Sequence, residues 1–105
     1  MHRDHVPTLP PGFLLLGYSP VCAVQGFVLR YPDSEAGDIA GKTHIFAVQG
    51  HPEFLPGIVH KIVDAREASG VMDASTVAMG RSQAGINDDG VDVIGKAIWR
   101  ILGVE

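Results

Sequence analysis

The chain has 105 residues, of which 46% are hydrophobic and 19% are charged, and its net charge is −4. These values suit one soluble globular domain or part of one. The acidic balance argues against nucleic acid and anionic membrane surfaces as main partners, because both bind clustered Lys and Arg side chains. The single cysteine, Cys22, excludes an internal disulfide framework and a cysteine-based zinc site, and it fits a reducing, cytoplasmic compartment.

The chain begins with a loop and a pair of strands. Residues 1–12 are polar and rich in proline, which predicts an extended loop. Two β-type runs follow, at 13–19 and 22–31, and they are joined through Pro20. The apolar zone that they form is interrupted too often by glycine, proline and glutamine to span a membrane.

A third strand is predicted after an acidic, glycine-containing loop at 32–42. It covers residues 43–49, and its central run from Ile45 to Val48 is apolar without alternation. Such a run is typical of a strand that is covered on both faces, as in a parallel sheet.

Two helices are predicted next, each with a recognisable end. Pro56 suits the first turn of a helix whose apolar residues recur at helical spacing, and Gly70 is its expected C-terminal cap. A second helix is predicted over 73–83, with Asp73 as its N-cap.

The last helix follows a loop at 85–90, with Asp88 or Asp89 as its cap and Gly103 at its end. Its apolar residues share one face: Val91, Ile94, Ile98 and Ile101. The order is therefore three strands and then three helices, an α/β chain. A sheet with so few helices to cover it resembles half of a larger domain, and an open apolar edge would invite pairing with another chain.

The chain places a histidine and a glutamate together where the third strand ends. Ligands of open α/β sheets bind outside the carboxyl ends of the strands, where His51 falls. Pro52 keeps His51 out of the helix that follows, and Glu53 lies close enough to accept a hydrogen bond from the imidazole. This pattern fits a general base with its orienting carboxylate, but the spacing alone favours a solvated turn with a glutamate stabilised by the helix dipole.

The run VQGHPEF at 48–54 resembles the C-terminal signature of class I glutamine amidotransferases. Residues 1–27 are similar to that family's His-x-Asp, Leu-Pro-x-Gly and Ser-x-x-Cys-x-x-Gln pattern, and residues 89–103 are similar to the closing helix of its fungal members. The resemblance implies that residues 1–105 are the C-terminal half of a flavodoxin-like or Rossmann-like domain of this class.

The same resemblance implies a Cys-His-Glu triad in which a cysteine thiolate attacks the amide of glutamine. His51 would move the proton, Glu53 would orient His51, and His2 and Asp4 would lie beside the substrate pocket. The family's nucleophile lies in Gly-x-Cys-x-Gly, which is absent here, and Cys22 matches the Ser-x-x-Cys segment instead. We therefore expect the chain to be inactive alone, with no cofactor.

Three alternatives remain open from the residues. The substrate of the complete domain is glutamine or a γ-glutamyl peptide, since nothing in these residues separates the two. A non-catalytic interaction module is the second alternative, with self-association through the open sheet edge. The third is a metal site built from His2, Asp4 and His5 with His51 or His44, although its spacing fits no standard signature. We expect no bound metal.

Overall fold

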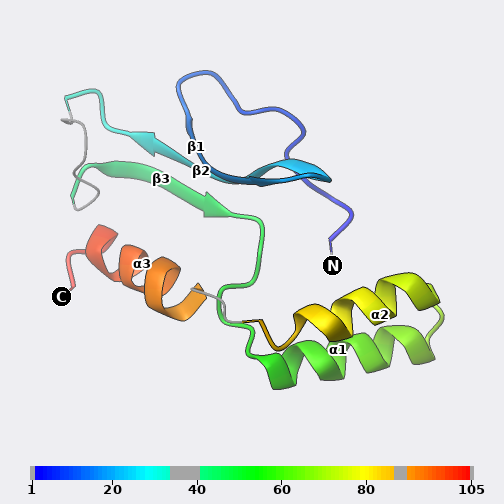
Figure 1. Ribbon diagram of the computed structural model, residues 1–105. Helices are drawn as coiled ribbons and strands as arrows, with labels where there is room; N and C mark the ends of the chain where they lie inside the picture. Colours follow the sequence, from blue (N-terminus) through cyan, green and yellow to red (C-terminus); the bar gives the residue numbers. More distant parts are fainter. Residues whose placement is uncertain (1, 34–40, 87–89, 105) are drawn as a thin grey trace.

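The computed structural model describes residues 2–33, 41–86 and 90–104, and it has the predicted order of strands followed by helices (Figure 1). The elements are β1 (Leu14–Ser19), β2 (Cys22–Arg30), β3 (Thr43–Val48), α1 (Pro56–Ala68), α2 (Ala74–Gln83), the π-helical segment η1 (Gly90–Gly95) and α3 (Lys96–Ile101). This is the expected α/β arrangement of three strands and then three helical segments. Within the described ranges, none of the helices is both long and apolar enough to cross a membrane.

The sheet is antiparallel throughout, in the order β1-β2-β3. The sequence predicted that β3 is covered on both faces, as in a parallel sheet, and this prediction is therefore wrong. Only residues 31–42 join β2 to β3, which is at the lower limit of the length that a crossover between parallel strands needs, whereas an antiparallel pair can be joined by far fewer residues. Apart from the buried Thr43, the β3 side chains are also only partly covered, and Ile45 is 39% exposed.

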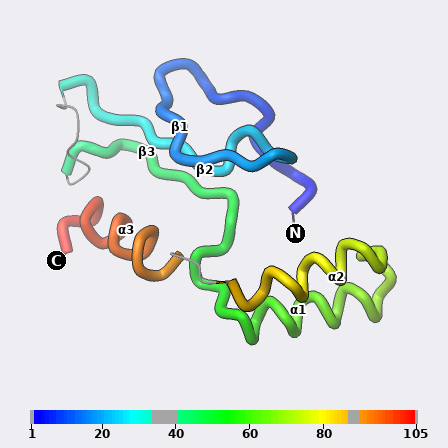
Figure 2. The backbone as a smooth tube through the Cα atoms, viewed as in Figure 1, coloured from blue at the N-terminus to red at the C-terminus, as the bar shows by residue number. Residues whose placement is uncertain are grey.

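Two small clusters of buried side chains take the place of one large core. On β2, alternate residues are buried, with Cys22, Val24 and Val28 on the same face of the sheet. Between α1 and α2, Val63 and Val77 are almost fully buried. The radius of gyration is 16.2 Å, whereas a compact chain of this length has about 13 Å. The α1–α2 hairpin accordingly extends away from the sheet, as the continuous trace in Figure 2 shows.

The predicted ends of α1 are confirmed. Pro56 occupies the first turn, where its missing N–H costs no intrahelical hydrogen bond. Gly70 has a φ of +71°, the left-handed conformation that closes a helix. Its N–H donates to the Glu67 carbonyl at 3.0 Å, and the Val71 N–H donates to the Arg66 carbonyl at 3.1 Å. These bonds satisfy carbonyl groups of the last turn and turn the chain back towards α2.

The predicted N-cap of α2 is confirmed as well. The Asp73 carboxylate accepts a hydrogen bond from the Thr76 N–H at 2.8 Å and another from the Ser75 hydroxyl at 2.9 Å. The pKa of Asp73 is lowered, first by the backbone N–H of Thr76 and then by the hydroxyls of Thr76 and Ser75. The charged carboxylate therefore stabilises the start of α2.

Replacing Asp73 with alanine is expected to lower the thermal midpoint at neutral pH. Because the pKa of Asp73 is lower in the folded chain than in the unfolded chain, its contribution is complete above the unfolded value of about 3.9. It is lost as the pH falls through the folded value. Circular dichroism melts of wild type and Asp73→Ala should therefore converge in acid. A gap that persists below both pKa values would contradict the cap's role.

The last helical region lies where it was predicted but does not begin as an α-helix. Residues 90–95 are π-helical, and α3 continues to Ile101. Glycine at both ends of η1 gives this stretch little preference for the α-helix. The predicted end is confirmed, since Gly103 has a φ of +75°. The predicted caps, Asp88 and Asp89, lie outside the described residues.

Candidate active site

A tight turn carries the chain from β3 into α1 and presents His51. The Phe54 N–H donates to the His51 carbonyl at 3.2 Å, and Pro52 lies within this turn. Pro56 disfavours helical geometry in the residue before it, Leu55, which is extended with a ψ of 159°. The helix α1 therefore begins only at Pro56. His51 is thereby held at the carboxyl end of β3, outside both elements.

His51 and Glu53 form a hydrogen-bonded pair. The His51 Nδ1 and Glu53 Oε1 atoms are 2.8 Å apart, and each side chain is 63% exposed. With Nδ1–H donating to the carboxylate, the lone pair of the ring lies on Nε2. The pKa of Glu53 is lowered, first by its own backbone N–H and then by the His51 ring. Glu53 therefore stays charged at neutral pH and favours the tautomer that a general base needs.

The Phe54 ring stacks on one face of the His51 ring. The His51 and Phe54 rings are parallel within 4°, and their centroids are 4.1 Å apart. Glu53 contacts one edge of the imidazole and Phe54 covers one face, and both contacts favour the observed orientation of the ring. We infer that Phe54 positions the histidine.

Removing the Glu53 carboxylate should change the tautomer of His51. In Glu53→Gln the amide no longer attracts the Nδ1 proton by charge, so the Nε2–H tautomer is expected to gain population. Nitrogen-15 chemical shifts of the imidazole measure the two populations directly. Glu67→Gln is the matched control, because Glu67 pairs with Arg81 instead. Equal tautomer populations in all three proteins would show that Glu53 does not orient His51.

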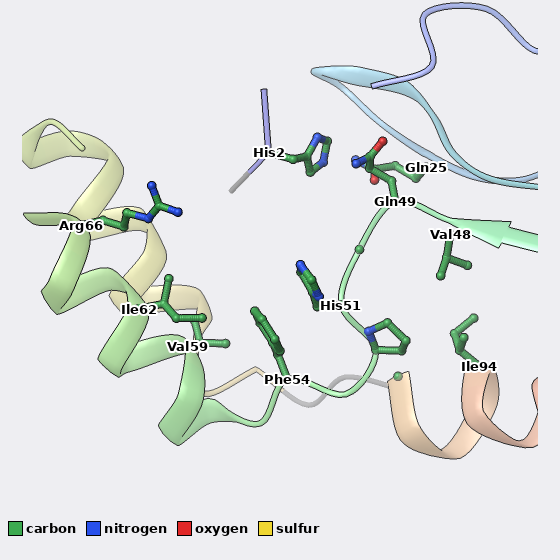
Figure 3. A pocket seen from close by; sticks show the side chains of 13 residues that line it. His2, Gln25, Val48, Gln49, His51, Phe54, Val59, Ile62, Arg66 and Ile94 are labelled. Atoms are coloured by element: carbon green, nitrogen blue, oxygen red, sulfur yellow. The ribbon is translucent and has the colours of Figure 1, made fainter. Parts of the chain in front are cut away.

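His51 opens onto a pocket of about 660 Å³ (Figure 3). The end of β3, the turn, one face of α1 and the start of the last helical region surround it. Its lining residues are His2, Gln25, Val48, Gln49, Gly50, His51, Pro52, Phe54, Val59, Ile62, Arg66, Gly90 and Ile94. An apolar pocket with a few convergent polar groups is the usual form of a small-molecule site.

Of the two N-terminal residues predicted to lie beside the substrate pocket, only one lines it. His2 lines it opposite α1, whereas Asp4 does not belong to its lining. The His2 Nδ1 and the His5 Nδ1 instead lie within hydrogen-bonding distance of backbone carbonyls, at 3.2 and 3.1 Å. His44 stacks on Tyr31. In the part of the chain that the structure describes, no three His, Cys, Asp or Glu side chains are grouped to hold a metal ion.

Cys22 does not line the pocket. It is buried and donates to the Val24 carbonyl, with Sγ and O 3.3 Å apart. The Ser19 hydroxyl accepts hydrogen bonds from the Cys22 N–H at 3.2 Å and from the Gln25 side-chain amide at 3.1 Å. The Ser-x-x-Cys-x-x-Gln pattern therefore has a structural role, because it ties the β1–β2 turn to the wall of the pocket.

Of the thirteen residues that line the pocket, only His2 and His51 were predicted from the sequence as site residues, and those not predicted include Gln49, Phe54 and Arg66. Gln49 has a local signal, since it directly precedes Gly50 and His51 at the end of a strand. Its N–H donates to the Gln25 carbonyl at 2.9 Å, which joins β3 to β2. Arg66 has none, because only the packing of α1 beside the turn brings it to the pocket.

Comparisons with known proteins give one partial relative. The chain is 40% identical over 63 residues to γ-glutamyl peptidase 3 of Arabidopsis thaliana, and this stretch covers 60% of the chain but 20% of the relative. A stretch of that length ends no earlier than residue 63 and begins no later than residue 43, so it includes His51 and Glu53. No protein-family model and no solved structure matches the chain. The chain therefore matches about a fifth of the length of this relative.

Proposed function

We propose that His51 and Glu53 are the base and its orienting carboxylate in the hydrolysis of a γ-glutamyl amide bond. The observation that carries the proposal is the 2.8 Å contact between His51 Nδ1 and Glu53 Oε1, with the ring lining a pocket. The bond that is cleaved is the side-chain amide of glutamine or the γ-glutamyl bond of a peptide. The name of the Arabidopsis relative favours the peptide.

The reaction needs a cysteine that lies outside these residues. His51 Nε2 would accept the proton of that thiol, and the thiolate would attack the γ-carbonyl. His51 would then return the proton to the departing nitrogen, which leaves ammonia or an amine and a glutamyl thioester. Water, activated by the same Nε2, would hydrolyse the thioester and restore the thiol. The cytosol keeps thiols reduced, so we also propose a cytoplasmic location.

A chimaera tests this proposal. The matched 63 residues of the Arabidopsis γ-glutamyl peptidase would be exchanged for those of this chain. We expect the purified chimaera to hydrolyse a γ-glutamyl dipeptide or glutamine, with glutamate release measured for both substrates in parallel. Release from the dipeptide alone would assign the peptidase reaction. A folded chimaera with no activity on either substrate would contradict the proposal.

A second candidate function is self-association through the exposed sheet. Large apolar side chains on β1 and β3 lie open to solvent, among them Leu14, Leu16 and Ile45. Exposed apolar surface at a sheet edge favours pairing with another chain. We expect sedimentation to detect a defined dimer at micromolar concentration and Ile45→Lys to dissociate it. A monomer in both proteins would exclude this function.

A further inference from the structure

Arg66 carries a positive charge that no described carboxylate neutralises at the pocket. Its two acidic neighbours on α1, Asp64 and Glu67, both contact the Arg81 guanidinium of α2, at 2.8 and 2.6 Å. These contacts raise the pKa of Arg81. Among the described residues no carboxylate forms an ion pair with Arg66.

The Arg66 side chain is directed towards the pocket by the geometry of α1. Arg66 follows Ile62 by four residues and therefore lies on the same face of the helix, above the apolar wall that Ile62 and Val59 form. Figure 3 shows its guanidinium on the side of α1 that faces His2. The opposite wall carries the side chains of Gln25 and Gln49.

The charges around this position favour an anion. Among the described residues that line the pocket, none is acidic, and Arg66 is the only permanently charged one. An adjoining hollow of about 470 Å³ is bounded by His2 and Arg66 again, and by Arg3 and Asp73. The Asp73 carboxylate is already bound to Ser75 and to the backbone of α2. Among the described residues that bound these two hollows, no carboxylate is therefore left to pair with the guanidinium.

We infer that Arg66 binds the carboxylate of a small-molecule amide, in the space between Arg66 and His2. A guanidinium matches a carboxylate through two parallel hydrogen bonds, which gives orientation as well as affinity. The amide end of such a ligand then extends past the apolar wall towards His51. The inference rests on the proposed function only for the identity of the ligand. It makes Arg66 the residue that selects substrates with a free carboxylate.

Two probes whose α-amino group is acetylated, and therefore uncharged, test the inference on the chain itself. N-acetyl-L-glutamine and N-acetyl-L-glutaminamide differ only in whether the terminal group is a carboxylate or a carboxamide. We expect N-acetyl-L-glutamine to bind about tenfold more tightly, measured by shifts of the His51 and His2 ring signals in NMR titrations. Arg66→Gln should remove this preference, and Arg66→Lys should keep part of it.

Arg100→Gln is the matched control, since Arg100 lies in the last turn of α3, outside the pocket lining. It should keep the full preference. Equal affinity for the two probes, a preference that survives Arg66→Gln, or no binding of either probe at millimolar concentration would each overturn the inference. Binding of the two probes requires no nucleophile. A hydrolytically inactive chimaera with intact carboxylate binding would therefore refute the proposed function and leave this inference standing.

Discussion

His51→Ala in the chimaera is expected to lower kcat by about 10²–10⁴-fold, the usual contribution of general acid–base catalysis. Alanine cannot accept the thiol proton or return it to the departing nitrogen, so both halves of the reaction lose their proton carrier. The KM should change little, because the apolar wall and Arg66 remain in place. Steady-state rates of glutamate release measure both constants.

His60→Ala is the control for this variant, since His60 is exposed on α1 and does not line the pocket. It should leave the kcat of the chimaera unchanged. A His51→Ala chimaera as active as its parent, with the expected circular dichroism spectrum, would remove His51 from the reaction and leave the hydrogen-bonded pair as a feature of the turn.

The helix ends could be predicted because their determinants are local. Pro56, Gly70 and Asp73 act within one turn of the backbone, so the sequence around each contains the whole physical cause. The same holds for His51 and Glu53, which are two residues apart and need only the turn at Pro52 to meet. A short separation leaves few alternative geometries.

The environment of β3 could not be read from its composition. An apolar run indicates that a strand could be covered on both faces, but the cover must come from other segments. The short connection from β2 to β3, residues 31–42, favours an antiparallel pair, and its length was a better guide than the apolar run. Arg66 illustrates the same limit, because its place at the pocket depends on the position of α1 relative to the turn.

Val63→Ala is expected to lower the free energy of unfolding by about 2 kcal/mol, from the lost methyl groups and the gap that they leave. Val63 is 1% exposed, the most buried large side chain described. A Cβ at Gly80 would lie 3.1 Å from Val63 Cγ2, so α2 already approaches this side chain closely. Val71→Ala, at an exposed position, should cost much less. Chemical denaturation followed by circular dichroism measures both.

A second substitution shows whether the close approach at Gly80 is the cause. Alanine is a better helix former than glycine by about 1 kcal/mol, but in the wild-type chain its methyl group would press against Val63. Gly80→Ala should therefore stabilise the Val63→Ala protein more than the wild type, by a coupling of at least about 0.5 kcal/mol. Additive effects would show that the two helices are not packed through this pair. Because α1 also carries Val59, Ile62 and Arg66, a loosened α1–α2 hairpin should weaken binding of N-acetyl-L-glutamine as well as stability.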